Sequence, residues 1–403
     1  MDKMEFEQGN PQEAPKRIEK KKKRHRWLRL GLVTVALVLA VLVAVLWDPT
    51  AFDGLRRSVI YASAQKDEAG CAKLYTYAAE KDSSFASLQG SLVQATNRRI
   101  LLLGEDGQTR YNADVRFTRC AVYATADRAA VYDIGGTEIY VLDARGLVRQ
   151  LTTEGEILSC TMNEKGALAV TINKSGYKAA VVVYNEKGEK IFAFNSSQRF
   201  LMTACVSDNG RQLAAVTLGQ SEGEFTSNLV IYDLDSTEPI LGGENSGKPV
   251  YDQGMVYDLG LVDDRWCAVG ENGLLFLQTN GKGKTETAYY GFAGGYLRRC
   301  SLQADHFAAL LLGRYKSGAQ GRLVTVSSQG EVLGELEVDR EVLSVTAAGR
   351  YVAVLYSDAL TVYDQNLEVC AQLDDASAAR VALMRADGSV VLAGADAASL
   401  YLP

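Results

Sequence analysis

Side chains that could perform acid–base or nucleophilic catalysis are scarce in this sequence of 403 residues. Only two histidines occur: His25 in a basic N-terminal segment, and His306 in the run QADHFAALL. A general base must lie within hydrogen-bond reach of its substrate; we expect His306 instead to lie at a strand turn, hydrogen-bonded or exposed. Ser63 and Lys66 have the Ser-x-x-Lys spacing of one nucleophile signature, but the companion motifs of that signature are missing.

Two glycine-rich segments approach the pattern of a phosphate-binding loop without matching it. GGENSGKP (242–249) has the glycine and lysine spacing, but Pro249 stands where a Ser or Thr must hold magnesium. NGKGKTET (280–287) contains Gly-Lys-Thr, but Gln278 stands where the first glycine belongs. We therefore interpret both segments as turns.

The seven cysteines are the next candidates for metal or redox chemistry. Cys120, Cys160, Cys205 and Cys300 recur at equivalent places of a repeated pattern, which would put them on inner strands around a channel. Metal sites usually contain close C-x₂-C pairs, which this sequence lacks. Cysteine is also among the most buried residue types, so we predict that these four side chains pack in the interior.

Two further possibilities concern a disulfide and calcium. Cys71 with Cys370 is the candidate disulfide, and the odd number of cysteines leaves at least one of them unpaired within a monomer. The acidic residues at 233–235, 263–264 and 374–375 fall in turn sequences without the full ligand loop of a calcium site. We predict no catalytic, cofactor or metal residues, and solvated carboxylates in the turns.

The elements that carry these residues are β-strands in a repeating unit. A β-rich run that ends in a polar turn recurs along the chain. Most copies are preceded by a second pattern, which consists of a β-rich run, a polar turn and a run of small apolar residues. Together they predict four strands per unit and a spacing of about 37–49 residues, typical of propeller blades. The copies are RRILLLGEDG (98–107), EIYVLDARG (138–146), AAVVVYNEKG (179–188), NLVIYDLDS (228–236), GLLFLQTNG (273–281), RLVTVSSQG (322–330), ALTVYDQN (359–366) and the partial ASLYLP (398–403).

The fold class that follows is an all-β, eight-bladed propeller, with seven blades as the alternative count. Strands such as AAVVVY are apolar on nearly every residue, as expected when both faces pack against neighbouring blades. The last copy ends at Pro403 without a fourth strand. We expect AKLYTYA (72–78) to supply that strand and close the ring.

One transmembrane α-helix is predicted before the propeller. Residues 30–47, from Leu30 to Trp47, form an apolar run of 18 residues without a charge, and Trp27 precedes it. As a helix this run spans roughly 27 Å, close to the ~30 Å hydrocarbon core of a bilayer. A cleaved signal peptide, the alternative, has a shorter apolar region and ends in small residues, which the sequence before Asp48 does not match.

Charge fixes the expected orientation and excludes a nucleic-acid partner. Residues 1–29 contain ten basic and five acidic residues, which leaves 33 basic and 44 acidic residues in the remainder. Basic flanks stay in the cytoplasm, and an acidic body is unsuited to phosphate contacts. Either the basic run only sets topology, or it also binds lipid headgroups; its members are Lys20, Lys21, Lys22, Lys23 and Arg24.

The domain organisation then has four parts. We predict a basic cytoplasmic tail over 1–26, a transmembrane helix over 27–47, a helical stalk over 48–70 and an extracytoplasmic propeller over 71–403. The stretch VYDIGGTEIYVLDARGLVRQLTTEGEIL (131–158), with FDGLRR (52–57) and the terminal ASLYLP, resembles a bacterial family of unknown function with membrane-anchored propellers of WD40-like or PQQ-like repeats. The resemblance implies a single-pass protein of the bacterial cell membrane. It implies no enzymatic activity, because the family is one of unknown function.

The expected function is a non-enzymatic binding or scaffolding module at the cell envelope. Membrane lipid would hold the anchor, and the partner would be an envelope protein or a glycan. Candidate contact loops are the longer insertions at 219–228, 242–254 and 313–321. The alternatives are a transmembrane sensor that reports through the tail, and an enzyme with a carboxylate site in the channel.

Overall fold

The computed structural model describes residues 31–35, 53–54, 57, 61, 65–80, 82–221, 223–236, 238–242, 250–251, 254–279 and 284–403. The chain divides into two compact units, Met1–Ile60 and Tyr61–Pro403. In the first unit, residues 31–35, 53–54 and 57 are helical. Across the residues described, the structure contains no helix long and apolar enough to cross a membrane. Apart from 31–35, the predicted span with Trp27, Leu30 and Trp47 lies outside the described residues, as does the basic run 20–24.

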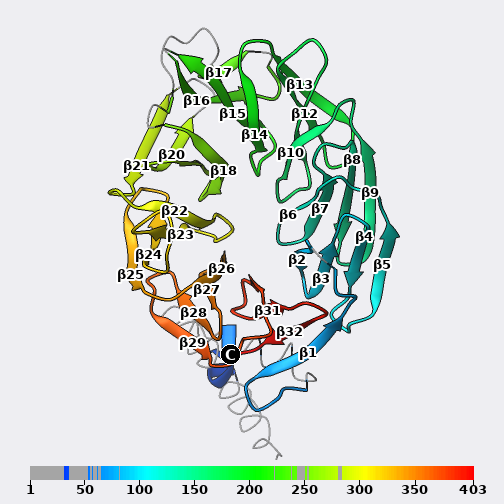
Figure 1. Ribbon diagram of the computed structural model, residues 1–403, viewed down its shortest axis with the longest axis vertical. Helices are drawn as coiled ribbons and strands as arrows, with labels where there is room; N and C mark the ends of the chain where they lie inside the picture. The colour runs from blue at the N-terminus through cyan, green and yellow to red at the C-terminus, as the bar shows by residue number, and fades with distance from the viewer. Residues whose placement is uncertain are drawn as a thin grey trace, which may run out of the picture. The chain divides into compact units, whose positions relative to one another are not determined.

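The second unit consists of eight four-stranded antiparallel sheets arranged as the blades of a closed ring (Figure 1). Blade 1 contains β2 (Ser84–Leu88), β3 (Ser91–Ala95), β4 (Arg99–Leu103) and β5 (Thr109–Asp114). Blade 2 contains β6 (Cys120–Ala124), β7 (Arg128–Asp133), β8 (Glu138–Asp143) and β9 (Gly146–Thr152). Blade 3 contains β10 (Ile157–Met162), β11 (Leu168–Ile172), β12 (Ala179–Tyr184) and β13 (Lys190–Ser196).

The remaining blades repeat this order. Blade 4 contains β14 (Phe200–Val206), β15 (Gln212–Ser221), β16 (Glu224–Asp233) and β17 (Pro239–Leu241), and blade 5 contains β18 (Val256–Val262), β19 (Arg265–Gly270), β20 (Gly273–Thr279) and β21 (Thr285–Gly291). Blade 6 contains β22 (Tyr296–Ser301), β23 (Phe307–Gly313), β24 (Gly321–Ser327) and β25 (Val332–Val338). Blade 7 contains β26 (Val342–Ala348), β27 (Tyr351–Tyr356), β28 (Leu360–Asp364) and β29 (Val369–Leu373), and blade 8 contains β30 (Val381–Met384), β31 (Val390–Ala393), β32 (Ala397–Tyr401) and β1 (Cys71–Thr76).

Burial along the strands explains why the blades form a ring. Every residue of β11, β12 and β27 is buried, because both faces of these middle strands pack against neighbouring blades. In the outer strand β13 only Ser196 is buried and the other residues are exposed or half-buried, as expected for a strand with one solvated face. The hydrophobic cores therefore lie between blades, for example where Val181 of blade 3 packs with Ala215 and Val230 of blade 4.

Ring closure joins the two ends of the propeller sequence. β1 pairs with β32, so that the fourth strand of blade 8 comes from before blade 1. The Leu402 amide donates a hydrogen bond of 3.0 Å to the Gly70 carbonyl, and Leu400, fully buried, packs between blades 8 and 1. The predicted count of eight blades and the predicted closing segment at 72–78 are both confirmed.

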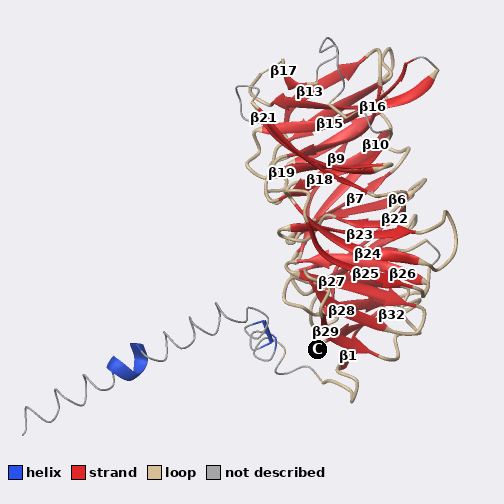
Figure 2. Ribbon diagram, turned by 90° about the vertical axis from the view of Figure 1, so that its left-hand side faces the viewer, coloured by secondary structure: helices blue, strands red, loops and turns tan. Residues whose placement is uncertain are grey.

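The strands end at two faces of the ring, seen edge-on in Figure 2. We call one the turn face: it carries the first-to-second and third-to-fourth strand turns of each blade. We call the other the loop face: it carries the second-to-third strand loops and the connections between blades. Parallel bridges join adjacent blades at each face, Ala304 with Gly349 at the turn face and Ile134 with Ile157 at the loop face.

The chain joins the ring on the turn face. β1 begins there at Cys71. The Tyr61 hydroxyl, at the start of the second unit, donates a hydrogen bond of 3.1 Å to Asp387 in the β30–β31 turn, and it accepts one of 3.3 Å from Arg385. The loop face is therefore the face opposite the point of attachment.

Candidate interaction face

A repeated irregularity of the inner strands shapes the loop face. In blades 3 to 7 the pairing of the first strand with the second slips by one residue near the start of the first strand. Each slip is a β-bulge, which leaves one residue out of the ladder and re-aims its side chain. The bulged residues, at equivalent places in five consecutive blades, are Leu158, Met202, Tyr257, Arg298 and Leu343.

Three of these bulged side chains are exposed at the channel mouth although they are apolar. Leu158 is 41% exposed, Met202 45% and Tyr257 52%. A bulge leaves its residue unpaired and re-aims the side chain, and here the three side chains are turned toward solvent.

The insertions predicted as contact loops belong to the same face. Residues 219–228 form the tip of the long β15–β16 hairpin, and residues 313–321 link β23 to β24. Phe225 is 60% exposed on the first and Tyr315 56% on the second. The third insertion, 242–254, connects blades 4 and 5 on this face, and much of it lies outside the described residues.

Exposed apolar side chains are concentrated on the loop face of blades 3 to 6. Among the described residues of the propeller, eight of the fourteen large exposed hydrophobic side chains lie there. The other six lie on the outer strands β9, β13, β21, β25 and β29, and none lies in a turn of the turn face. We call these eight the apolar patch: Leu158, Tyr177, Phe200, Met202, Phe225, Tyr257, Tyr296 and Tyr315.

Basic side chains stand over the aromatic rings of the patch. The Lys178 ammonium lies 5.1 Å from the centroid of the Phe200 ring, and the Lys316 ammonium lies 5.8 Å from that of Tyr296. Arg314 lies 5.7 Å from the ring of Tyr315. These cation–π contacts hold both partners near the surface and give the patch a cationic border.

The turn face has the opposite character. The first turn of each blade from 2 to 6 contains at least one carboxylate: Asp127, Glu164, Asp208, the pair Asp263 and Asp264, and Asp305. Burial, and then the charges of the neighbouring carboxylates, raise the pKa of Glu164. Burial also raises the pKa of Asp208. Among the described residues, no group of three or more His, Cys, Asp or Glu side chains could hold a metal ion.

One carboxylate lies in the channel itself. The negative charge of Asp258 interacts with Tyr123 on blade 2, Cys205 on blade 4 and Cys300 on blade 6. Because these blades surround the channel, Asp258 lies toward the centre of the ring. Its side chain is in contact with water. The protein around it still removes part of the bulk solvent from the carboxylate, and this desolvation raises the pKa of Asp258. The Leu259 amide donates a hydrogen bond of 2.8 Å to one of its oxygens.

His306 lies at the β22–β23 turn, as predicted, and is well exposed. Its Nδ1 is 2.5 Å from Oδ1 of Asp263, and the Ser328 hydroxyl donates a hydrogen bond of 3.1 Å to the other oxygen of that carboxylate. A nucleophile is activated by bonding to its base. Here the serine bonds to the aspartate and not to the histidine, so the arrangement is not that of a serine nucleophile.

The sequence matches a family of unknown function, DUF5711, over residues 65–389, which is most of the chain. The protein belongs to this family. No curated protein matches the sequence. The match begins close to the first strand of the ring and ends before its last strand, so the family pattern is the propeller itself.

Solved structures that resemble this member of DUF5711 are propellers. The C-terminal WD40 domain of Sif2 is 14% identical with a TM-score of 0.58, covering 83% of this chain and 98% of that chain. The Dos1 propeller is 10% identical with a TM-score of 0.52, covering 82% and 95%. BamB from Moraxella catarrhalis is 13% identical with a TM-score of 0.50, covering 82% and 98%. At these identities the likeness shows the fold alone.

The cysteines lie where the repeat predicted, on first strands of four blades. Of the four that we expected in the interior, Cys160 and Cys205 are buried, whereas Cys120 and Cys300 are half-buried. Burial raises the pKa of Cys160 and of Cys205 to about 12. A thiol with such a pKa stays protonated at neutral pH and is a poor metal ligand. The predicted disulfide between Cys71 and Cys370 is wrong, because the two residues are not bonded to each other: Cys370 is exposed on the outer strand β29, whereas Cys71 is half-buried on β1.

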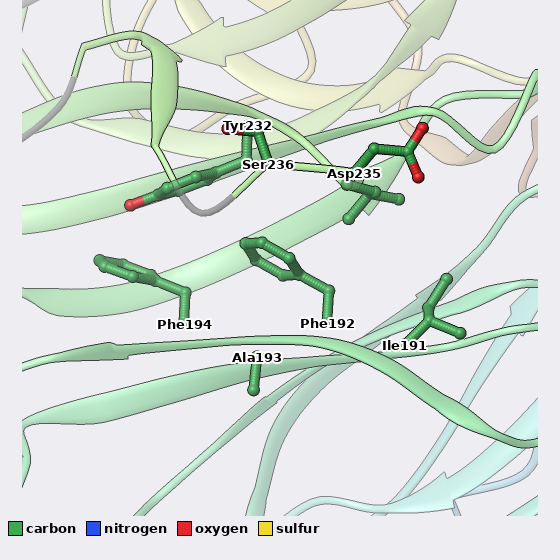
Figure 3. A pocket seen from close by; sticks show the side chains of 8 residues that line it. Ile191, Phe192, Ala193, Phe194, Tyr232, Asp235 and Ser236 are labelled. Atoms are coloured by element: carbon green, nitrogen blue, oxygen red, sulfur yellow. The ribbon is translucent and has the colours of Figure 1, made fainter.

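A hollow lies at the rim between blades 3 and 4 (Figure 3). Phe192 and Phe194 of β13 face Tyr232 of β16, with ring centroids 5.4 Å and 5.0 Å from that of the tyrosine. The hollow measures about 280 Å³ and is open to solvent. Blade 4 has a fourth strand, β17, of only three residues, and we interpret the hollow as a consequence of that short strand.

Proposed function

We propose that this DUF5711 protein is a non-enzymatic binding module, anchored in the bacterial cell membrane, whose loop face docks an envelope protein. The observation that supports this is the apolar patch on blades 3 to 6. Exposed apolar side chains that gather on one face, with polar residues at the rim, mark interaction sites of proteins.

The composition of the patch favours a protein as the partner. Tyr, Phe, Met and Arg are the residue types enriched at protein–protein interfaces, and four of the eight patch residues are tyrosines. A tyrosine offers a large contact area and has few rotatable bonds to order on binding. A partner protein can therefore gain from contact with several of these side chains at once.

The proposed location rests on the sequence and on the point of attachment. An apolar helix over 27–47, with Trp27, Leu30 and Trp47 near its ends, would place the propeller outside and the basic run 20–24 at the inner headgroups. The ring receives the chain on its turn face. The loop face lies on the opposite side of the ring from this point of attachment.

Crosslinking in intact cells, followed by mass spectrometry, tests the docking face. The variant Phe225→Ser, Tyr257→Ser, Tyr315→Ser removes three exposed side chains of the patch. The control Val332→Ser, Val369→Ser removes exposed apolar side chains, 46% and 62% exposed, from the outer strands β25 and β29. We expect one protein to be crosslinked to the wild type and the control and to be lost from the patch variant.

Two outcomes would contradict the proposal. If the patch variant keeps every crosslink of the wild type, the apolar patch is not the docking face. If protease added to intact cells leaves the C-terminal portion uncut while a known external protein is cleaved, the proposed outer location is wrong. For the crosslinking experiment, circular dichroism must show that the patch variant and the control keep the wild-type fold.

A further inference from the structure

Four basic side chains on the loop face of blade 6 form the most distinctive part of the surface. We call them the basic corner: Arg298 and Arg299 on β22, with Arg314 and Lys316 on the β23–β24 loop. Among the ion pairs of the described residues, none involves any of these four. Elsewhere Arg110, Lys190 and Arg322 each lie within ion-pair distance of a carboxylate.

The β23–β24 loop is held in place from within. The Arg298 guanidinium, on the bulge of β22, donates hydrogen bonds to the carbonyls of Gly318 and, at 2.9 Å, Tyr315. Arg299 in turn donates one of 3.0 Å to the Arg298 carbonyl. Residues 314–320 are all exposed, so these bonds present Arg314 and Lys316 to solvent in a fixed arrangement. Preorganisation of this kind lowers the ordering cost of binding.

Carboxylates mark the limits of the basic corner. Glu271 lies on the loop of blade 5, and Asp339 and Glu341 lie on the connection from blade 6 to blade 7, all exposed. A long polyanion that crossed the corner would meet these charges on both sides. A short anionic stretch would pair with the corner and avoid them, because exposed charges interact strongly only within about 10 Å.

We propose that the basic corner binds an acidic segment of the partner protein: a short stretch with two or more carboxylates beside apolar side chains. The carboxylates would pair with Arg299, Arg314 and Lys316. The apolar side chains would lie on Tyr296 and Tyr315, which flank the cations. This inference rests on the proposed function and names the chemistry of one part of the partner.

The charge of the rest of the protein supports this choice. After residue 29 the chain has 44 acidic and 33 basic residues, and the turn face carries carboxylates in five consecutive blades. An acidic partner is repelled by most of this surface and attracted at the corner. Such complementarity directs the encounter to one face.

Fluorescence polarisation with the full-length purified protein tests the inference. The probe is a labelled peptide of alternating Glu and Leu, the matched probe has Gln in place of Glu, and polyphosphate is the polyanion competitor. The variant is Arg314→Ala, Lys316→Ala. The control is Arg145→Ala, Lys187→Ala, which removes the same charge from exposed residues in turns of the turn face.

We expect the Glu–Leu peptide to bind the wild type and the control equally and the variant about five- to tenfold more weakly, with the difference shrinking as salt is added. Four results would overturn the inference: no measurable binding of the Glu–Leu peptide, equal binding of the Gln peptide, equal losses in variant and control, or tighter binding of polyphosphate than of the peptide. None of these four results contradicts the proposed function. The proposed function is contradicted by a different result, namely that the patch variant keeps its crosslinks in cells.

Discussion

Removal of the last strand should unfold the whole ring and not only blade 8. Deletion of residues 398–403 takes away nearly all of β32, which pairs with β31 on one side and with β1 on the other. It also removes Leu400, Tyr401 and Leu402, which are at most 5% exposed. Burial of three such side chains contributes roughly 5–9 kcal/mol, a loss comparable to the ~5–15 kcal/mol that stabilises a typical domain.

Thermal unfolding followed by circular dichroism measures this loss, and limited proteolysis shows where the chain opens. Deletion of Pro403 alone, which leaves β32 intact, is the control. We expect the longer deletion to abolish the cooperative transition and to expose sites in all blades, since β1 then lacks a partner. A deletion variant that still melts cooperatively within a few degrees of the control would refute the closure argument.

Two other predictions concern titratable groups. Burial raises the pKa of Asp258, so its contribution to stability is present below the ordinary carboxyl pKa and is lost as the pH rises through the raised value. Asp258→Asn should therefore raise the melting temperature at neutral pH, and this gain should disappear in acid; an equal gain at all pH values would contradict this. Because Cys370 is exposed and Cys160, Cys205 and Cys267 are buried, maleimide labelling read by mass spectrometry should modify the first in the native state and the other three only after unfolding.

The blade pattern was predictable because the relevant signals are local. EIYVLDARG and AAVVVYNEKG place an apolar run directly before a polar turn, and the structure has the third strands β8 and β12 at those segments. The missing fourth strand after the last copy also pointed to a segment before blade 1. Local periodicity and the need to pair every strand edge therefore determined the architecture.

The candidate site was less predictable because it depends on register and closure. Nothing in VYDLGLV shows that Tyr257 is the residue left out of the ladder; that depends on how β18 pairs with β19. Asp127, Glu164 and Asp208 each look like ordinary turn residues, and only the ring brings their charges together. A usable signal did exist, since Phe200 and Tyr296 are aromatic residues that begin inner strands.

The pairing of β1 with β32 also determines how the ring responds to mechanical load. When tension on the chain before Cys71 acts along the axis of β1, it loads the antiparallel pairing of β1 with β32 in shear. Hydrogen bonds in such a pair run across the strands, so all five residue pairs of β1 and β32 resist the pull together and none can be opened first from the end. A tether at this point joins the propeller through a shear joint, the arrangement in which two paired strands are hardest to separate by force.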